Sequence, residues 1–266
     1  MKTNKICCVA ELKEDIDDMI MIDYLFRCSN DCQYLVLDPM PKKDDMLAQK
    51  RLKEIESWGI RIEEEILPET KIIFNGGRFT KIANYLKKGH TLDYLFANGG
   101  FAGINIVDEE DILEKFKNKR FVRTFNLNMD VISGSYVVNS DNIKKMVFVS
   151  KNVCHSGENT ITGIWKNYSF LKKYNLKPHK RLHDLLMAKE GTSILHREKM
   201  LLNYLPVDFV TEHGLQGVQT KWGSRYNDSS NIYISTNFLK PNKETIEEID
   251  KIEKKDVDDF MFAIAS

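Results

Sequence analysis

The chain has 266 residues, 42% of them hydrophobic and 29% charged, a composition typical of a soluble protein that can bury a sizeable core. Lysine plus arginine equals aspartate plus glutamate at 39 each, so no overall field attracts nucleic acid or an anionic membrane. Because no apolar run is long enough for a signal peptide or a membrane span, we expect a cytoplasmic protein that binds a small uncharged ligand.

Apolar and amphipathic segments alternate along most of the chain. Strands are predicted at residues 6–10, 34–37, 60–62, 71–74, 94–97, 121–125 and 146–149, and helices at 19–26, 45–58, 80–87, 129–138 and from residue 180. This alternation indicates the α/β class, with an open, mostly parallel, Rossmann-like sheet flanked by helices. Alternating polarity at 208–211 and 231–235 predicts a short antiparallel extension near the C-terminus, and 243–259 predicts a solvated helix. With no repeat and no linker, we expect a single domain over residues 1–266.

The segment Glu11–Asp18 (ELKEDIDD) crowds carboxylates between the first strand and the first helix. Ligands of α/β sheets bind beyond the carboxyl ends of the strands, so acids at this point can hold a metal ion or sugar hydroxyls. Helix capping is the alternative interpretation. In that case Asp15 is the N-cap, and Asp17 and Asp18 lie in the first turn, where negative charge suits the helix dipole.

Two glycine pairs follow later strands, in Asn75–Gly77 and in Asn98–Gly100. Glycine at a strand end lets the backbone approach a ligand closely, although ordinary turns use the same residues. Neither segment matches a phosphate-binding loop, which argues against a dinucleotide or a triphosphate.

Two further polar segments are candidates for a ligand site. Thr124–Asp130 places two amides and an acid after a predicted strand, groups suited to sugar hydroxyls, although a helix cap by Asn128 explains part of the pattern. His183 and Asp184 open a predicted helix and offer a proton donor beside a carboxylate. Exposed surface polarity is the alternative for that pair.

These segments, in this order, resemble motifs of the inosine-uridine nucleoside hydrolase family over essentially the whole chain. The matches are Glu11–Asp18 with D-x-D-x-x-x-D-D, Gly77–Ala83 with G-P-L-T-N-I-A, Asn98–Gly100 with M-G-G, Thr124–Asn126 and Asp130 with E-F-N and D-P-E-A-A, His183–Ala188 with H-D-P-L-A-V-A, and Gly214–Thr220 with G-x-x-x-G-x-T. The resemblance implies hydrolysis of the N-glycosidic bond of a nucleoside or a related ribosyl compound. It also implies a calcium cofactor and a homodimer or homotetramer.

The resemblance assigns roles to residues of this chain. It implies that Asp18, Asp184 and the backbone carbonyl of Gly76 face the metal, that Asp17, Asn126, Asn105 and Asp130 bind ribose, and that His183 assists the departing base.

Lys13 departs from the family pattern, because it stands where the resemblance implies an aspartate that ligates calcium and accepts the proton of the attacking water. Like unit charges at about 4 Å and an effective dielectric near 20 repel by about 4 kcal/mol, and a divalent ion doubles this to about 8. We therefore expect that calcium and Lys13 exclude each other.

Two functions remain open from the sequence. In the first, the chain is an N-ribosyl hydrolase in which the Lys13 ammonium replaces the metal beside Asp18 and Asp184, and Glu11 or Glu14 is the catalytic base. In the second, the chain binds a ribosyl ligand without hydrolysing it. The histidine at position 183 favours the first, and the lost aspartate favours the second.

Overall fold

The computed structural model describes residues 5–13, 16–101, 112–119, 121–151, 183–197, 204–206, 208–212, 215–220 and 232–235. Glu14, Asn105 and the predicted helix at 243–259 lie outside these residues. None of the helices in the described ranges is long and apolar enough to cross a membrane.

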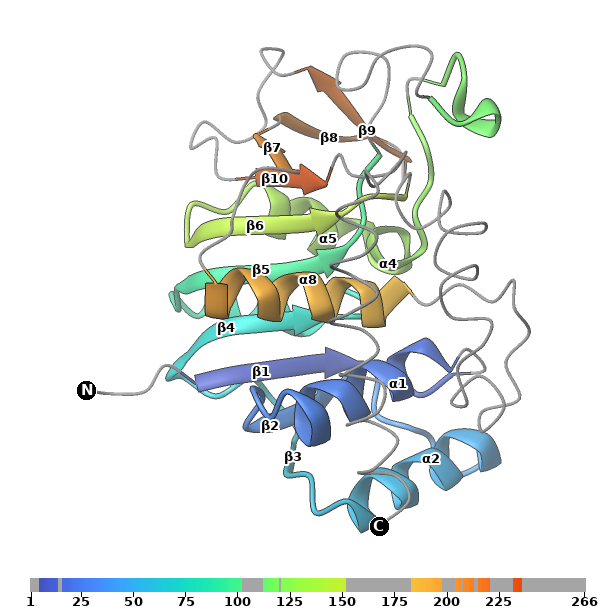
Figure 1. Ribbon diagram of the computed structural model, residues 1–266, viewed down its shortest axis with the longest axis vertical. Helices are drawn as coiled ribbons and strands as arrows, with labels where there is room; N and C mark the ends of the chain where they lie inside the picture. Colours follow the sequence, from blue (N-terminus) through green and yellow to red (C-terminus); the bar gives the residue numbers. More distant parts are fainter. Residues whose placement is uncertain are drawn as a thin grey trace.

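The centre of the described structure is a sheet with the strand order β3-β2-β1-β4-β5-β6-β10-β7 (Figure 1). Its strands are β1 (Lys5–Ala10), β2 (Tyr34–Leu37), β3 (Ile62–Glu63), β4 (Thr70–Asn75), β5 (Leu92–Asn98), β6 (Ile143–Val149), β7 (Tyr204–Pro206) and β10 (Ile232–Ser235). The strands from β3 to β10 in this order are parallel to one another, which confirms the predicted mostly parallel sheet.

The C-terminal strands have two kinds of pairing. At the sheet edge, β10 is parallel to β6 on one side and antiparallel to β7 on the other. The strands β8 (Asp208–Glu212) and β9 (Leu215–Thr220) form a separate antiparallel pair. The predicted extension at 208–211 therefore lies outside the main sheet, whereas the segment predicted at 231–235 lies within it.

Helices cover both faces of the sheet. They are α1 (Asp17–Asp23), the π-helix η1 (Tyr24–Cys28), α2 (Met46–Ser57), α3 (Thr80–Lys87), the 3-10 helix η3 (Glu114–Phe116), α4 (Phe125–Met129), α5 (Val131–Val138) and α8 (His183–Arg197). The helices α1 and α8 pack against each other on one face (Figure 1). On the other face α3 packs against α5.

Strand β1 shows why this sheet needs helices on both faces. Cys7 and Val9 lie in the core beneath α3 and α5, whereas Cys8 and Ala10 lie in the core beneath α1 and α8. All four side chains are fully buried. Because successive residues of a strand point to opposite faces, a continuous apolar run is suited to a strand that is covered on both sides.

The predicted strand at 121–125 is wrong. Strand β5 pairs directly with β6, and the chain enters α4 at Phe125 after an extended Thr124. Asn128 stabilises this helical turn, because both its backbone N–H and its Nδ2 donate to the carbonyl of Thr124. Asn128 therefore does not cap the next helix; the N-cap of α5 is Asp130.

Three neighbouring strands, β1, β4 and β5, end together at one edge of the sheet, as expected from their parallel pairing. The helices α1 and α4 lie at this edge, and α8 starts there and runs back across the sheet (Figure 1). The edge therefore gathers residues that are far apart in sequence, and it is where an α/β sheet of this kind binds ligands.

Candidate functional site

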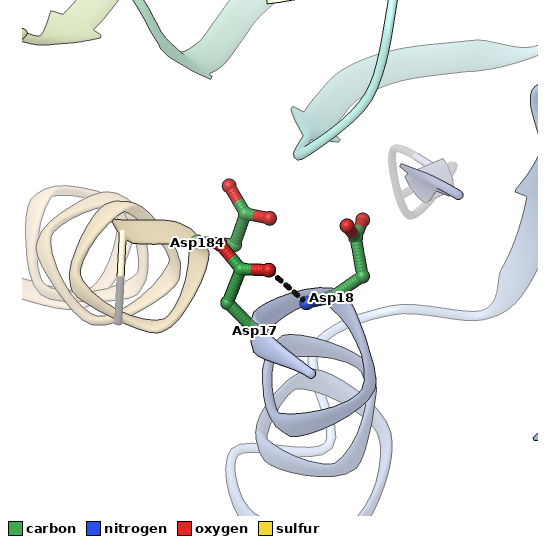
Figure 2. Close-up of side chains that lie close together, drawn as sticks. All are labelled: Asp17, Asp18 and Asp184. Carbon is green, nitrogen blue, oxygen red and sulfur yellow. Dashed lines mark hydrogen bonds between the residues drawn. The ribbon is translucent and has the colours of Figure 1, made fainter. Parts of the chain in front are cut away.

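Three carboxylates meet at this edge. Asp17 and Asp18 lie in the first turn of α1, and Asp184 lies in the first turn of α8 (Figure 2). One oxygen from each lies within 4.8 Å of the others. Their exposed fractions are 9%, 5% and 3%, so three acids lie close together with little access to water.

Burial and mutual repulsion decide the electrostatics of this group, which we call the carboxylate cluster. Burial, followed by the charge of Asp17, raises the pKa of Asp18 well above its ordinary value. The positive ends of the α1 and α8 dipoles offset part of the negative charge. Buried carboxylates this close still require a shared proton or a bound cation to be stable together.

Neutral N–H groups hold one oxygen of each acid. The backbone N–H of Asp18 donates to Asp17 Oδ1 at 3.2 Å, and the backbone N–H of Glu11 donates to Asp18 Oδ1 at 3.1 Å. Asn98, the last residue of β5, donates from its Nδ2 to Asp184 Oδ1. The acids are thus oriented by groups that leave their charge in place.

Gly76 lies directly against the carboxylate cluster. A Cβ atom at this position would be 2.8 Å from Asp18 Oδ1 and 2.8 Å from Asp184 Oδ2, closer than van der Waals contact allows. Its carbonyl oxygen accepts a hydrogen bond from Asn126 Nδ2 at 2.9 Å. The structure therefore brings together five of the residues singled out from the sequence: Asp17, Asp18, Gly76, Asn126 and Asp184.

Lys13 is not placed as the sequence analysis expected. Its Nζ lies 2.9 Å from Glu11 Oε2, in an ion pair whose glutamate is buried and whose lysine is half exposed. The ammonium also lies over the ring of Phe125, 5.2 Å from the centroid, and 3.8 Å from Met129 Sδ. The hypothesis that it is paired with Asp18 and Asp184 is therefore wrong.

The donor set of the cluster fits a hard divalent cation. Carboxylate and carbonyl oxygens are the ligands that calcium prefers, and the cluster offers three carboxylates, two of which lie directly against Gly76. The missing Cβ of Gly76 leaves the close approach of Asp18 and Asp184 possible. Because Lys13 is paired with Glu11, its charge is offset locally and no longer excludes such an ion.

Asp130 is a structural residue in this arrangement. Its Oδ1 accepts the backbone N–H of Ser133 and caps α5, and its Oδ2 accepts the hydroxyl of Thr80 at the start of α3. Burial would raise the Asp130 pKa, but the hydrogen bonds from Thr80 and Ser133 outweigh it and lower the value. These contacts tie α5 to α3, and the role of Asp130 in ribose binding stays a prediction.

Buried oxygens without hydrogen-bond partners lie around the same edge. Within the described residues they include Oδ1 of Asn75, which ends β4, Oδ1 of Asn98, which ends β5, and Oγ1 of Thr124, which precedes α4. Buried polar atoms are nearly always satisfied in folded proteins. Groups of this kind favour a ligand rich in hydroxyl groups.

Sequence reasoning missed Asn98 as a side chain of the site. The signal was present, because Asn98 directly follows a predicted strand, as Asn75 and Gly76 do. The glycines of this segment are its more conspicuous feature in the sequence. His183 is the first residue of α8, immediately before Asp184, and it is half buried.

Two solved structures share this fold over nearly the full length of both chains. A plant nucleoside hydrolase, the PpNRh1 enzyme, has a TM-score of 0.57 and 10% sequence identity, and the match covers 96% of this chain and 99% of that one. An inosine-guanosine nucleoside hydrolase, IG-NH, has a TM-score of 0.53 and 11% identity, with coverage of 96% and 98%. No protein-family model and no curated protein matches the sequence. The chain therefore has the fold of nucleoside hydrolases, and at this identity the likeness extends to the fold alone.

Proposed function

We propose that this chain hydrolyses the N-glycosidic bond of a nucleoside or a related ribosyl compound. The observation that carries the proposal is the carboxylate cluster at the carboxyl edge of the sheet, in a fold shared with nucleoside hydrolases. The buried oxygens of Asn75, Asn98 and Thr124 support a ligand that presents hydroxyl groups. The zero net charge fits an uncharged small molecule.

Asp18, Asp184 and the carbonyl of Gly76 would hold a divalent cation, for which calcium is the candidate. When bound, the ion would supply positive charge next to the ribose hydroxyls and to the attacking water. Asp17 and Asn126 would bind ribose hydroxyls. Carboxylate and amide groups accept and donate the hydrogen bonds that vicinal hydroxyls need.

His183 would protonate the departing base. As the bond from the anomeric carbon to the base nitrogen breaks, its electron pair stays on the base, and a proton from His183 neutralises the developing negative charge. The ribosyl group becomes oxocarbenium-like in this step. The acids of the cluster would stabilise its positive charge electrostatically.

Glu11 would accept the proton of the attacking water as the water oxygen bonds to the anomeric carbon. Its carboxylate lies at the end of β1, its backbone N–H holds Asp18, and Lys13 fixes its position through the ion pair. In this role it would replace the aspartate that the family resemblance implies at position 13.

A second function is favoured by one observation. Glu11 Oε2 is held by Lys13 Nζ in an ion pair, so this carboxylate oxygen already has a partner and would have to give it up to contact an attacking water. A chain with this feature would bind a ribosyl ligand without cleaving it.

Incubation of the purified protein with a panel of purine and pyrimidine nucleosides tests the proposal. Release of free base together with free ribose supports the hydrolase, and Asp18→Asn should abolish it. Saturable nucleoside binding by calorimetry with no released base would establish the second function instead. If no nucleoside of the panel is cleaved or bound, both functions are excluded.

A further inference from the structure

The three anchors of the carboxylate cluster differ in one respect. Asp17 and Asp18 are each held by a backbone N–H, from Asp18 and Glu11 respectively. Asp184 is held by the side chain of Asn98. A backbone anchor is present whatever the side chain, whereas the hydrogen bond from Asn98 to Asp184 depends on the residue type at position 98.

Asn98 is placed to act on Asp184 from an independent element. It ends β5, in the middle of the sheet, while Asp184 begins α8, so the hydrogen bond ties the start of the helix to the rigid strand edge. The exposed fractions of Asn98 and Asp184 are 7% and 3%. A buried hydrogen bond of this kind has no competing water, and it defines one orientation of the carboxylate.

The chemistry of the donor matters as much as its position. An amide N–H orients a carboxylate without cancelling its charge, whereas a lysine or arginine at position 98 would neutralise it. With Oδ1 held by Asn98, the other oxygen of Asp184 is directed to Gly76, where a Cβ would lie 2.8 Å from Oδ2. Asp18 Oδ1 approaches the same point.

We infer that Asn98 is a positioning residue for Asp184, which it holds facing Asp18 and Gly76 with its charge available to a divalent cation. The inference rests on the cation-binding part of the proposed function. Outer-sphere groups that orient metal ligands typically change metal affinity by about 10- to 100-fold. We expect an effect of that size at position 98.

Calorimetric titration with calcium of the unmodified chain and of Asn98→Leu is the test. Leucine has a similar volume and no donor, so the affinity for calcium should fall about 10- to 100-fold. Asn98→Ser keeps an O–H donor on a smaller side chain, and it should lose less. Asn139→Leu is the matched control, because Asn139 Nδ2 also donates one hydrogen bond, to the Ser135 carbonyl at the end of α5.

The outcomes separate this inference from the function on which it rests. If Asn98→Leu leaves the calcium affinity unchanged, the role of Asn98 is overturned. The same holds if Asn98→Ser or Asn139→Leu lowers the affinity as much as Asn98→Leu does. Neither result affects the proposed cation site. No calcium binding by the unmodified chain would overturn both the inference and the cation site. If calcium affinity depends on Asn98 but no nucleoside is cleaved, the inference stands and the hydrolase is excluded.

Discussion

Lys13 and Glu11 form an ion pair with 2.9 Å between Nζ and Oε2, at the turn that leads from β1 to α1. The ammonium also contacts the ring of Phe125 in α4. The pair therefore links this turn to α4 beside the carboxylate cluster. Because Glu11 offsets the charge of Lys13, the cluster keeps its own negative charge.

Lys13→Asp should strengthen calcium binding by at least about tenfold. Even in water, unit charges about 4 Å apart interact by about 1 kcal/mol, and the substitution both removes a positive charge and adds a carboxylate near the cluster. Lys13→Met, which only removes the charge, should give a smaller gain. Calorimetric titration of the three proteins measures this, and equal affinities would show that Lys13 has no influence on the site.

Gly76→Ala should lower stability by about 1–3 kcal/mol, the usual cost of overpacking a buried site, and should abolish calcium binding. The new methyl group would lie 2.8 Å from Asp18 Oδ1 and from Asp184 Oδ2. Gly77→Ala is the control, because its Cβ would meet no atom closer than 3.6 Å. Urea unfolding and calcium titration of both variants are the measurements; similar behaviour of the two would contradict the packing argument.

Asp18→Asn should stabilise the calcium-free protein at neutral pH. Burial first, and Asp17 second, raise the pKa of Asp18 well above 3.8. The folded state then keeps a proton that the unfolded chain has released, so the stability of the unmodified protein falls as the pH rises above about 4. The Tm difference between variant and unmodified protein should therefore grow from about pH 4 to about pH 7. A difference independent of pH would contradict the raised pKa.

Calcium should reverse the order of the Tm values of Asp18→Asn and the unmodified protein. A ligand stabilises the fold through its occupancy of the native state, and Asp18→Asn removes one of the proposed ligands. At saturating calcium the Tm of the unmodified protein should rise, and the Tm of Asp18→Asn should stay the same. An equal gain in both proteins would place the ion elsewhere.

Gly191→Ala should destabilise the protein even though alanine is the better helix former by about 1 kcal/mol. A Cβ at this position of α8 would overlap Phe74 Cε1 and lie 2.9 Å from Phe96 Cγ. The helix must then move away from β4 and β5. Ser193→Ala, in the same helix, should be nearly neutral, and a stabilising Gly191→Ala in urea unfolding would show that the helix does not rest on these rings.

His183→Ala should slow hydrolysis of an ordinary nucleoside much more than hydrolysis of a ribosyl substrate with a good leaving group. A leaving-group acid is needed only when the departing group is a poor one. His196→Ala is the matched control, because His196 lies near the other end of α8 and pairs with Asp31. Equal slowing of both substrates by His183→Ala would remove its role as an acid.

Most of the fold was accessible from local sequence patterns. The helix at 80–87 was predicted with the bounds that the structure gives, and the strands before Glu11, Gly76 and Asn98 were each identified. These elements have strong periodicity and clear glycine or polar ends. The prediction of a strand at 121–125 is wrong because its apolar residues suit a strand, whereas Thr124 is the N-cap of α4 and accepts hydrogen bonds from Asn128, so that the helix begins at Phe125.

The parallel sheet and the edge at which polar residues gather can be read from the sequence alone. Both follow from the alternation of apolar strands with helices and from the shared direction of parallel strands. Which side chains meet at that edge depends on the folded arrangement of the chain. The pairing of Lys13 with Glu11 instead of Asp18 and Asp184, and the anchoring of Asp184 by Asn98, depend on rotamers and on the placement of α8 across 86 residues of chain. Spacing along the sequence does not encode such contacts, because they arise from packing between elements that meet only once the chain is folded.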